Sequence, residues 1–263
     1  MQYFDTHAHI GLIYDDPIEQ LFVTQEARQA SVSRIISICN SLTDFSRVYN
    51  NLVSAPNVYH AVGVSPSEVQ RAGKTWQTDV EKFAKLPRIV AIGETGLDYY
   101  HKFGDKKSQI ELFIGHLDTA ERLGLPVIVH NREAGYDILD ILKDRIPSRG
   151  GVFHCYSEDA RYAERVLASG LNMFFSFAGN LTYRNARNLH ETVAVLPLDR
   201  ILIESESPFM VPADFRGKRN MPKYLPITAQ YLADMLNISD EELATALWEN
   251  SNRFFGLPND GAP

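Results

Sequence analysis

Six side chains that could bind a metal ion stand at the ends of short apolar runs in this sequence. They are His7, His9, Glu94, His130, His154 and Glu206. Each of the five runs indicates a strand that stops at its polar residue. Imidazole and carboxylate groups are ligands for Zn, Mn, Fe or Mg. The pattern therefore predicts a metal site where the ends of several strands meet.

The number of these ligands indicates more than one ion. Four histidines and two acids exceed the needs of one tetrahedral ion and suit two divalent ions, about 3.5–4 Å apart, that share a carboxylate. Such ions lower the pKa of a bound water and hold the oxygen of a scissile group, which predicts a hydrolase. Each residue alone has an ordinary alternative, because a histidine can bond a backbone carbonyl and Glu94 can form a salt bridge. The joint pattern is what favours the metal site.

Eight short apolar runs, rich in Val, Ile and Phe, alternate with amphipathic stretches along the chain. The runs cover residues 2–9, 33–39, 58–64, 88–94, 126–130, 151–155, 172–177 and 200–204. Helical patterns cover 105–123, 133–145 and 158–169, and a last helix from 240 opens with Ser239 and Glu242 spaced as a capping box. This order favours a single-domain α/β protein, a (β/α)8 TIM barrel over residues 1–258, followed by a flexible tail at 259–263. An open doubly wound sheet is the alternative.

In a barrel, the loops after the strands form the face where active sites gather, so the candidate ligands should converge there. Alternate residues of a strand share a face, which points His7 and His9 the same way with Asp5 one layer deeper. Asp5 and Glu204 lie on the ligand-bearing face and could orient the histidines by hydrogen bonds. Salt bridges in the barrel core are the alternative for these two acids.

The remaining histidines and one cysteine are expected to have other roles. His116 lies in a predicted helix and should pack or be solvated, and His60 should be a satisfied core or rim residue. His101 follows the fourth run and could reach a substrate, although a solvated loop position is favoured. Cys155 should be buried, unreactive and turned away from its neighbouring histidine.

Composition limits the class of protein. The chain has 263 residues, 44% of them hydrophobic and 22% charged, which is enough for a substantial globular core. Its two cysteines show no CxxC spacing, which argues against a disulfide framework and favours a reducing compartment. The start does not resemble a signal peptide, and no apolar run approaches the ~20 residues of a membrane span. We therefore expect a cytoplasmic protein without membrane contact. The sequence does not fix the oligomeric state, with a monomer slightly favoured.

Segments along almost the whole chain resemble the TatD family of metal-dependent hydrolases. They are FDTHAHI at 4–10, GETGLDYY at 93–100, LPVIVHNREA at 125–134, FHCYS at 153–157, IESESPF at 203–209 and RGKRNMP at 216–222, in the family's order and spacing. The resemblance implies a TIM barrel of the amidohydrolase superfamily. It also implies a deoxyribonuclease, often an exonuclease, that uses divalent metals.

The same resemblance implies how the ligands divide between two ions. By position, one ion would be held by His7, His9 and Glu206, and the other by His130 and His154, with Glu94 bridging. Glu206 departs from the family, which usually has Asp there, and its longer arm changes the geometry of the first ion and of any proton acceptor. Ser65 and Ser67 replace two loop histidines of the family. Any role of those histidines in gripping a phosphate would then be lost or reassigned.

The rim loops offer the groups that a nucleic acid would need. Phosphodiester cleavage requires cations for the phosphate and aromatic faces for the bases, and Arg132, Tyr156 and Arg219 are the predicted substrate contacts. The basic run around Arg219 could equally be a solvated loop, and the net charge of −7 requires a local basic patch for such a partner. These features predict a deoxyribonuclease acting on DNA. The alternatives are a small-molecule ester, lactone or amide hydrolase of the same superfamily and a metal-binding homologue with impaired catalysis. The fourth run offers no lysine for a carboxylated bridge, which favours the TatD-like interpretation.

Overall fold

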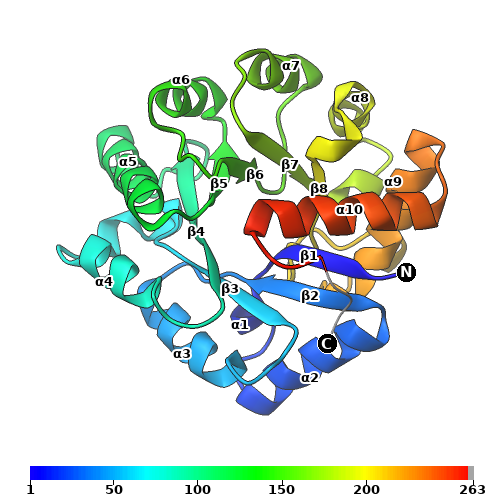
Figure 1. Ribbon diagram of the computed structural model, residues 1–263, viewed down its shortest axis with the longest axis horizontal. Helices are drawn as coiled ribbons and strands as arrows, with labels where there is room; N and C mark the ends of the chain where they lie inside the picture. The colour runs from blue at the N-terminus through cyan, green and yellow to red at the C-terminus, as the bar shows by residue number, and fades with distance from the viewer. Residues whose placement is uncertain (260–263) are drawn as a thin grey trace.

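The computed structural model describes residues 1–259 and contains one eight-stranded parallel sheet, in the order β1 to β8, with helices outside it (Figure 1). The strands are β1 (Tyr3–Ala8), β2 (Val32–Ser37), β3 (Val58–Val62), β4 (Ile89–Asp98), β5 (Val127–Arg132), β6 (Gly151–Phe153), β7 (Met173–Phe177) and β8 (Ile201–Ile203). Each strand pairs in parallel with the next in sequence, as short apolar strands joined by crossover helices must. The predicted single-domain (β/α)8 barrel is confirmed.

The barrel closes between β1 and the segment that follows β8. Ala8 and Ser207 form a parallel bridge, and the backbone N–H of His9 donates to the carbonyl of Ser207 at 2.8 Å. The N–H of Glu206 donates to the carbonyl of His7 at 2.9 Å. Closure therefore brings Glu206 beside the two N-terminal histidines, although about two hundred residues separate them in the sequence.

Helices cover the outside of the barrel. Within residues 1–259 they are α1 (Ile10–Ile13), α2 (Pro17–Gln29), α3 (Leu42–Leu52), α4 (Trp76–Phe83), α5 (Lys106–Leu123), α6 (Gly135–Arg145), α7 (Ala160–Ala168), α8 (Arg187–Val195), α9 (Leu225–Leu236) and α10 (Asp240–Phe255). α5 lies within the helical pattern predicted at 105–123 and buries Phe113, Leu117 and Ala120. α10 begins where the capping pattern predicted, with the Ser239 side chain accepting a hydrogen bond from the N–H of Glu242 at 3.2 Å.

One helix, α10, lies across the amino end of the barrel instead of along its side (Figure 1). It buries Trp248, Phe254 and Phe255 against the barrel interior, and the Phe255 ring lies 5.5 Å from that of Phe4 in β1. Because this end is filled by aromatic side chains, a site for ligands has to lie at the carboxyl ends of the strands.

Several predicted strand ends were wrong, and three of them bear on Glu94, His130 and Glu206. β4 continues past Glu94 and β5 past His130, because these two strands go on pairing as far as Asp98 and Arg132. β8 ends at Ile203, so Glu206 lies on the loop after it rather than at its end. Glu94 and His130, like His7, are thus held inside strands, and Glu206 is held by a loop.

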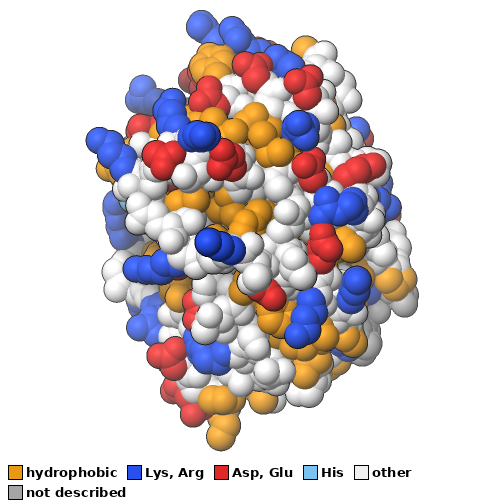
Figure 2. Space-filling model, turned by 90° about the vertical axis from the view of Figure 1, so that its left-hand side faces the viewer, with side chains coloured by type: hydrophobic (Ala, Val, Ile, Leu, Met, Phe, Trp, Pro, Cys, Tyr) orange, Lys and Arg blue, Asp and Glu red, His pale blue; other side chains and the backbone are white. Residues whose placement is uncertain are grey.

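On the side that carries α4 and α5, acidic and basic side chains are interspersed over most of the face, and several Lys and Arg side chains lie along the left-hand edge of the view (Figure 2). Among residues 1–259, no helix is both long enough and apolar enough to cross a lipid bilayer. The flexible tail predicted at 259–263 lies outside the described residues except for Asn259, whose side chain accepts a hydrogen bond from Asn252 at 3.2 Å.

Candidate metal centre

A cleft of about 530 Å³ opens at the carboxyl ends of the strands. Five of the six predicted ligands line it, namely His9, Glu94, His130, His154 and Glu206. The sixth, His7, is fully buried behind them in β1. Strands β1, β4 and β5 and the loops after β1, β6 and β8 therefore deliver all six to one place.

The first group of donor atoms centres on the two histidines of the first strand. The Nε2 atoms of His7 and His9 lie 3.2 Å apart, and each lies 3.5 Å from Oε2 of Glu94. Oε2 of Glu206 lies 3.4 Å from Nε2 of His7 and 4.0 Å from Nε2 of His9. Four donor atoms therefore face one another.

The second group is on the other side of the same glutamate. Nδ1 of His130 lies 3.1 Å from Nε2 of His154 and 3.4 Å from Oε1 of Glu94. Nε2 of His154 lies 4.0 Å from the same Oε1. Each carboxylate oxygen of Glu94 thus faces one pair of histidines, which is the arrangement of a carboxylate shared between two ions.

These separations fit the dimensions of metal coordination. Bonds of about 2.0–2.1 Å in a tetrahedral site place the ligand atoms about 3.4 Å apart, close to the distances in both groups. Oε2 of Glu94 and Oε2 of Glu206 are buried and have no hydrogen-bond partner among residues 1–259. Because an unpartnered buried carboxylate oxygen is costly, a cation is the natural partner for both. The donor set fits divalent ions bound by nitrogen and oxygen.

The electrostatics of the cluster keep its carboxyl groups ionised. Burial by itself raises the pKa of Glu94, but the neighbouring His7 imidazole and the charges of His154 and His130 outweigh it and lower that pKa well below its ordinary value. For Glu206, burial is likewise outweighed by His7 and His154, so its pKa is also lowered. Both acids therefore carry the negative charge that a metal ligand requires.

The two acids expected to orient histidines behave differently from each other. Oε1 of Glu204, which is fully buried, accepts a hydrogen bond from the N–H of Cys155 at 2.7 Å and lies 3.5 Å from Nδ1 of His154. Glu204 can thus fix the His154 ring so that Nε2 is free for an ion. Asp5 instead accepts from backbone, the N–H of Ser205 at 2.8 Å and that of His7 at 3.3 Å. Asp5 therefore stabilises the junction between β1 and the segment after β8 and does not orient an imidazole ring.

Asp98 is an orienting acid that sequence reasoning missed. Its Oδ2 lies 3.2 Å from Nε2 of His130, which leaves Nδ1 of that ring facing Glu94. Burial raises the pKa of Asp98, but the hydrogen bonds with His130 and His101 outweigh it and lower that pKa below its ordinary range. The signal was available in the sequence, because Asp98 follows Glu94 by four residues on one strand and even spacings share a face.

Ser65, one of the two serines in the loop that departs from the family, contacts the carboxylate of Glu94. Its hydroxyl lies 3.2 Å from Oε1 of Glu94, to which it donates, and 3.1 Å from the hydroxyl of Ser67. Both serines line the cleft. Glu94 therefore has a hydrogen-bond donor from this loop, the Ser65 hydroxyl, which is uncharged and on a shorter side chain than a histidine.

Of the predicted substrate contacts, Arg132 lies where it was expected. It is exposed on the rim of the cleft, and its guanidinium lies 4.9 Å from the centre of the Tyr100 ring. Stacking on an aromatic face limits the freedom of the arginine while leaving its N–H groups available to an anion.

The other two predicted contacts have to be corrected. Tyr156 is only 2% exposed, and its hydroxyl donates to the carbonyl of Asp159 at 2.9 Å. It packs against the outer side of β7, because the chain turns at Cys155, where φ is +41°. The guanidinium of Arg219 donates to the carbonyl of Ile13 and is not among the cleft residues.

Cys155 and His60 differ from expectation in part, whereas His116 does not. Cys155 is half-buried and lines the cleft instead of turning away from it. Burial and the acids around it, Glu206 first, raise the pKa of its thiol well above the usual value. An unreactive thiol therefore remains the expectation. His116 is packed as expected, stacked 4.3 Å from Trp76. His60 is buried, but its Nε2 has no partner among residues 1–259, so it is not satisfied.

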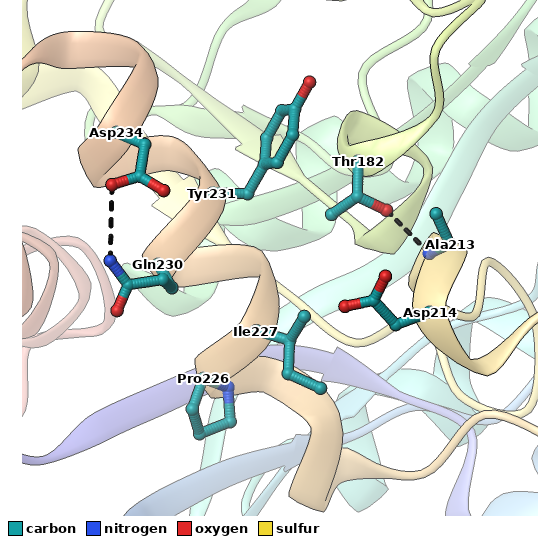
Figure 3. A pocket seen from close by; sticks show the side chains of 8 residues that line it. All are labelled: Thr182, Ala213, Asp214, Pro226, Ile227, Gln230, Tyr231 and Asp234. Carbon is teal, nitrogen blue, oxygen red and sulfur yellow. Dashed lines mark hydrogen bonds between the residues drawn. The ribbon is translucent and has the colours of Figure 1, made fainter.

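A second hollow, of about 550 Å³, lies between α9 and the short 3-10 turn Ala213–Phe215. Its lining includes Asp214 and Asp234, which stand on opposite sides of the hollow, and Tyr231 between them (Figure 3). Asp234 accepts a hydrogen bond from Gln230 at 3.4 Å. No histidine or cysteine is among its lining residues, so the convergent metal donors are in the barrel cleft.

Comparison with known families gives one match along nearly the whole chain. The family model described as TatD related DNase matches residues 4–256. A metal-dependent hydrolase of Bacillus subtilis, YabD, is 34% identical over 97% of this chain and 99% of its own length. A metal-dependent hydrolase named TatD from Mycobacterium tuberculosis is 31% identical over 96% of this chain and 97% of its own length. Both relatives carry the word uncharacterized in their names.

Solved structures give the same result. The crystal structure of YJJV, a TatD homologue of Escherichia coli, is 28% identical, with a TM-score of 0.89 over 97% of this chain and 98% of the other. A TatD family hydrolase of Entamoeba histolytica, at 21% identity and a TM-score of 0.83 over 97% of this chain and 98% of the other, shares the fold.

Proposed function

The chain belongs to the TatD family of metal-dependent hydrolases, and on that premise we propose that it is a deoxyribonuclease, acting as an exonuclease-type phosphodiester hydrolase with two divalent ions. The observation that carries the proposal is the position of Glu94, whose two oxygens each face one histidine pair at the floor of a cleft. Zn, Mn or Mg ions bound there would supply an activated water and offset the charge that develops on a phosphate.

The residues around this centre have distinct tasks in the proposed reaction. Glu206 is ionised and faces the first histidine pair, so it can accept the proton that the attacking water loses. Glu204 and Asp98 keep the rings of His154 and His130 in place. Arg132, on the rim, can bind a non-bridging phosphate oxygen through its planar fork.

A small-molecule ester, lactone or amide hydrolase is the second candidate. The volume of about 530 Å³ is within the usual range for small ligands, and the net charge of −7 does not attract a polyanion. The substrate therefore has to be decided by turnover, with DNA as the substrate that we propose.

The test compares substrates on defined metal content. Protein stripped by chelation would be reconstituted with Mg, Mn or Zn, and end-labelled single-stranded DNA, duplex DNA, RNA and a set of carboxylic esters, lactones and amides would be assayed. We expect about two ions per chain and metal-dependent shortening of DNA, with Glu94→Gln as the inactive control. One ion or fewer per chain would exclude the binuclear centre. Turnover of carboxylic esters, lactones or amides without turnover of DNA would favour the second candidate, and no turnover of any substrate would indicate impaired catalysis.

A further inference from the structure

His101 stands on the wall of the cleft, on the loop that leaves β4. Its side chain is 51% exposed, and it lines the same cleft as the predicted ligands. The imidazole lies between two aromatic rings, with centroids 4.8 Å from Tyr100 and 5.2 Å from Phe103. A half-exposed ring with two packed neighbours is held in place and can still exchange protons with water.

Asp98 holds His101 through two hydrogen bonds. Nδ1 of the ring lies 2.8 Å from Oδ2 of Asp98, and the backbone N–H of His101 donates to Oδ1 at 2.8 Å. A carboxylate beside Nδ1 fixes the tautomer that keeps a proton there, so Nε2 is the atom that can gain or lose a proton. Within residues 1–259, no hydrogen bond or ion pair of that Nε2 is found.

The same Asp98 connects His101 to the metal centre. Its Oδ2 is shared between Nδ1 of His101 at 2.8 Å and Nε2 of His130 at 3.2 Å. His101 is therefore close to the second group of donor atoms without being part of it. His101 and Glu206, the residue that can take the proton of the water, both line the cleft.

We propose that His101 is a catalytic residue of this chain that protonates the leaving oxygen of the substrate, an inference that rests on the proposed phosphodiesterase function. As the bond from the water oxygen to phosphorus forms and the bond from phosphorus to the leaving oxygen breaks, the proton on Nε2 of His101 passes to that leaving oxygen. The product departs as a neutral alcohol. The proton of the water goes to Glu206, and exchange with solvent restores both residues.

The charges around His101 set the balance for this task. Asp98 of β4 favours the imidazolium, whereas Lys102 in the same loop, and His130 and Arg132 of β5, oppose it. A structural role is the simple alternative, in which the ring fills the space between its aromatic neighbours or steadies Asp98. The two roles predict different results. Loss of a general acid slows only the reactions whose leaving group needs a proton, whereas loss of a structural residue slows both kinds.

The experiment compares two substrates that differ in the leaving group. Thymidine 5′-(4-nitrophenyl phosphate) releases a nitrophenolate that needs no protonation, and a thymidine dinucleotide releases a sugar alkoxide that does. We expect His101→Gln to lower kcat/KM for the dinucleotide by about 10²–10⁴-fold and for the nitrophenyl ester by less than about threefold. The alkaline limb of the pH profile for the dinucleotide should disappear, because that limb would report the loss of the acid.

Two controls separate the possible outcomes. Lys107→Gln, at a position on α5 whose side chain is 85% exposed, should change neither substrate, and elemental analysis should find the same metal content in His101→Gln as in the parent. Equal losses on both substrates, or a lower metal content, would assign His101 to binding or structure and overturn the proposal, as would no loss at all. A parent protein without activity on either ester would overturn the proposed function, and this inference with it.

Discussion

The two ends of the barrel are made by the same eight strands and are filled in opposite ways. At the carboxyl end, histidines and ionised glutamates face one another, and four buried carboxylate oxygens, on Asp5, Glu94, Glu204 and Glu206, have no hydrogen-bond partner in the described chain. At the amino end, α10 covers the opening and packs aromatic rings on the interior, with Phe254 5.2 Å from Phe174 and Phe255 5.5 Å from Phe4 (Figure 1). The first end is arranged to receive a cation and the second to exclude water.

This contrast indicates that stability and chemistry have separate places in the molecule. Apolar rings at the amino end stabilise the fold in proportion to the area they bury. Converging buried charges at the carboxyl end oppose folding until a ligand compensates them. Substitutions at the two ends should therefore have separable effects.

The largest effect is expected from a substitution of Glu94, whose carboxylate lies between the two histidine pairs. Glu94→Gln keeps the shape but removes the charge that both histidine pairs face, so we expect the metal content to fall below two ions and kcat/KM to fall by at least about 10³-fold. The metal-free protein should be as stable as the parent, or more so, because a buried charge is gone. Elemental analysis, turnover and denaturation in chelator measure the three quantities. Glu111→Gln, on the exposed face of α5, is the control and should change none of the three quantities. An unchanged metal content in Glu94→Gln would contradict the separation of chemistry and stability between the two ends of the barrel.

A substitution at the amino end of the barrel should change the stability of the fold without changing the metal content. Phe255→Ala removes a ring that is 4% exposed and should lower the free energy of unfolding by about 3–5 kcal/mol, through lost burial and the cavity left behind. Metal content should stay the same as in the parent. Denaturant titration in chelator gives the first value. Phe22→Ala, at a position 56% exposed, should cost within about 0.5 kcal/mol. Loss of metal from the Phe255 variant would show that the ends are coupled.

A pair of variants at Glu206 tests the acid on the loop after β8. Glu206→Gln should reduce turnover by roughly 10²-fold or more, because an amide is a poor ligand and cannot accept a proton. Glu206→Asp should keep metal binding and keep or raise turnover, since aspartate restores the family's residue and tolerates the left-handed backbone, where φ is +55°. Both would be assayed on the best nucleic-acid substrate. A glutamine variant as fast as the parent would shift the role to Glu204, which also lies beside His154.

The smallest effect is expected on the rim. Arg132→Ala should weaken transition-state binding by roughly 1.5–3 kcal/mol, the worth of a hydrogen bond to a charged group, without a change in metal content. Arg219→Ala is a matched control, because that guanidinium bonds the Ile13 carbonyl away from the cleft. The measurement is kcat/KM on DNA. Equal losses in both variants would point to a general effect of surface charge instead of a phosphate contact.

The interior of the strands and the general place of the ligands followed from the sequence. Apolar runs with the period of a strand are a local signal, and alternation with helices leaves few topologies for a parallel sheet. His7, His9, Glu94, His130 and His154 come near the carboxyl ends of strands in such a fold, so they had to share one face. The position of α10 across the amino end was not predictable in this way, because an amphipathic helix can pack on the side of a barrel equally well.

What the sequence by itself determined is the barrel and the set of residues that meet at its open end, because both depend on short-range periodicity and on parallel topology. Only the tertiary structure decided which atoms face each other. A left-handed turn at Cys155, with φ of +41°, sends Tyr156 outward, and barrel closure beside β1 brings in Glu206 from a loop. The continuation of β4 beyond Glu94 places Asp98 between His130 and His101. Loop dihedrals and side-chain hydrogen bonds set these contacts, and neither leaves a periodic signal in the chain.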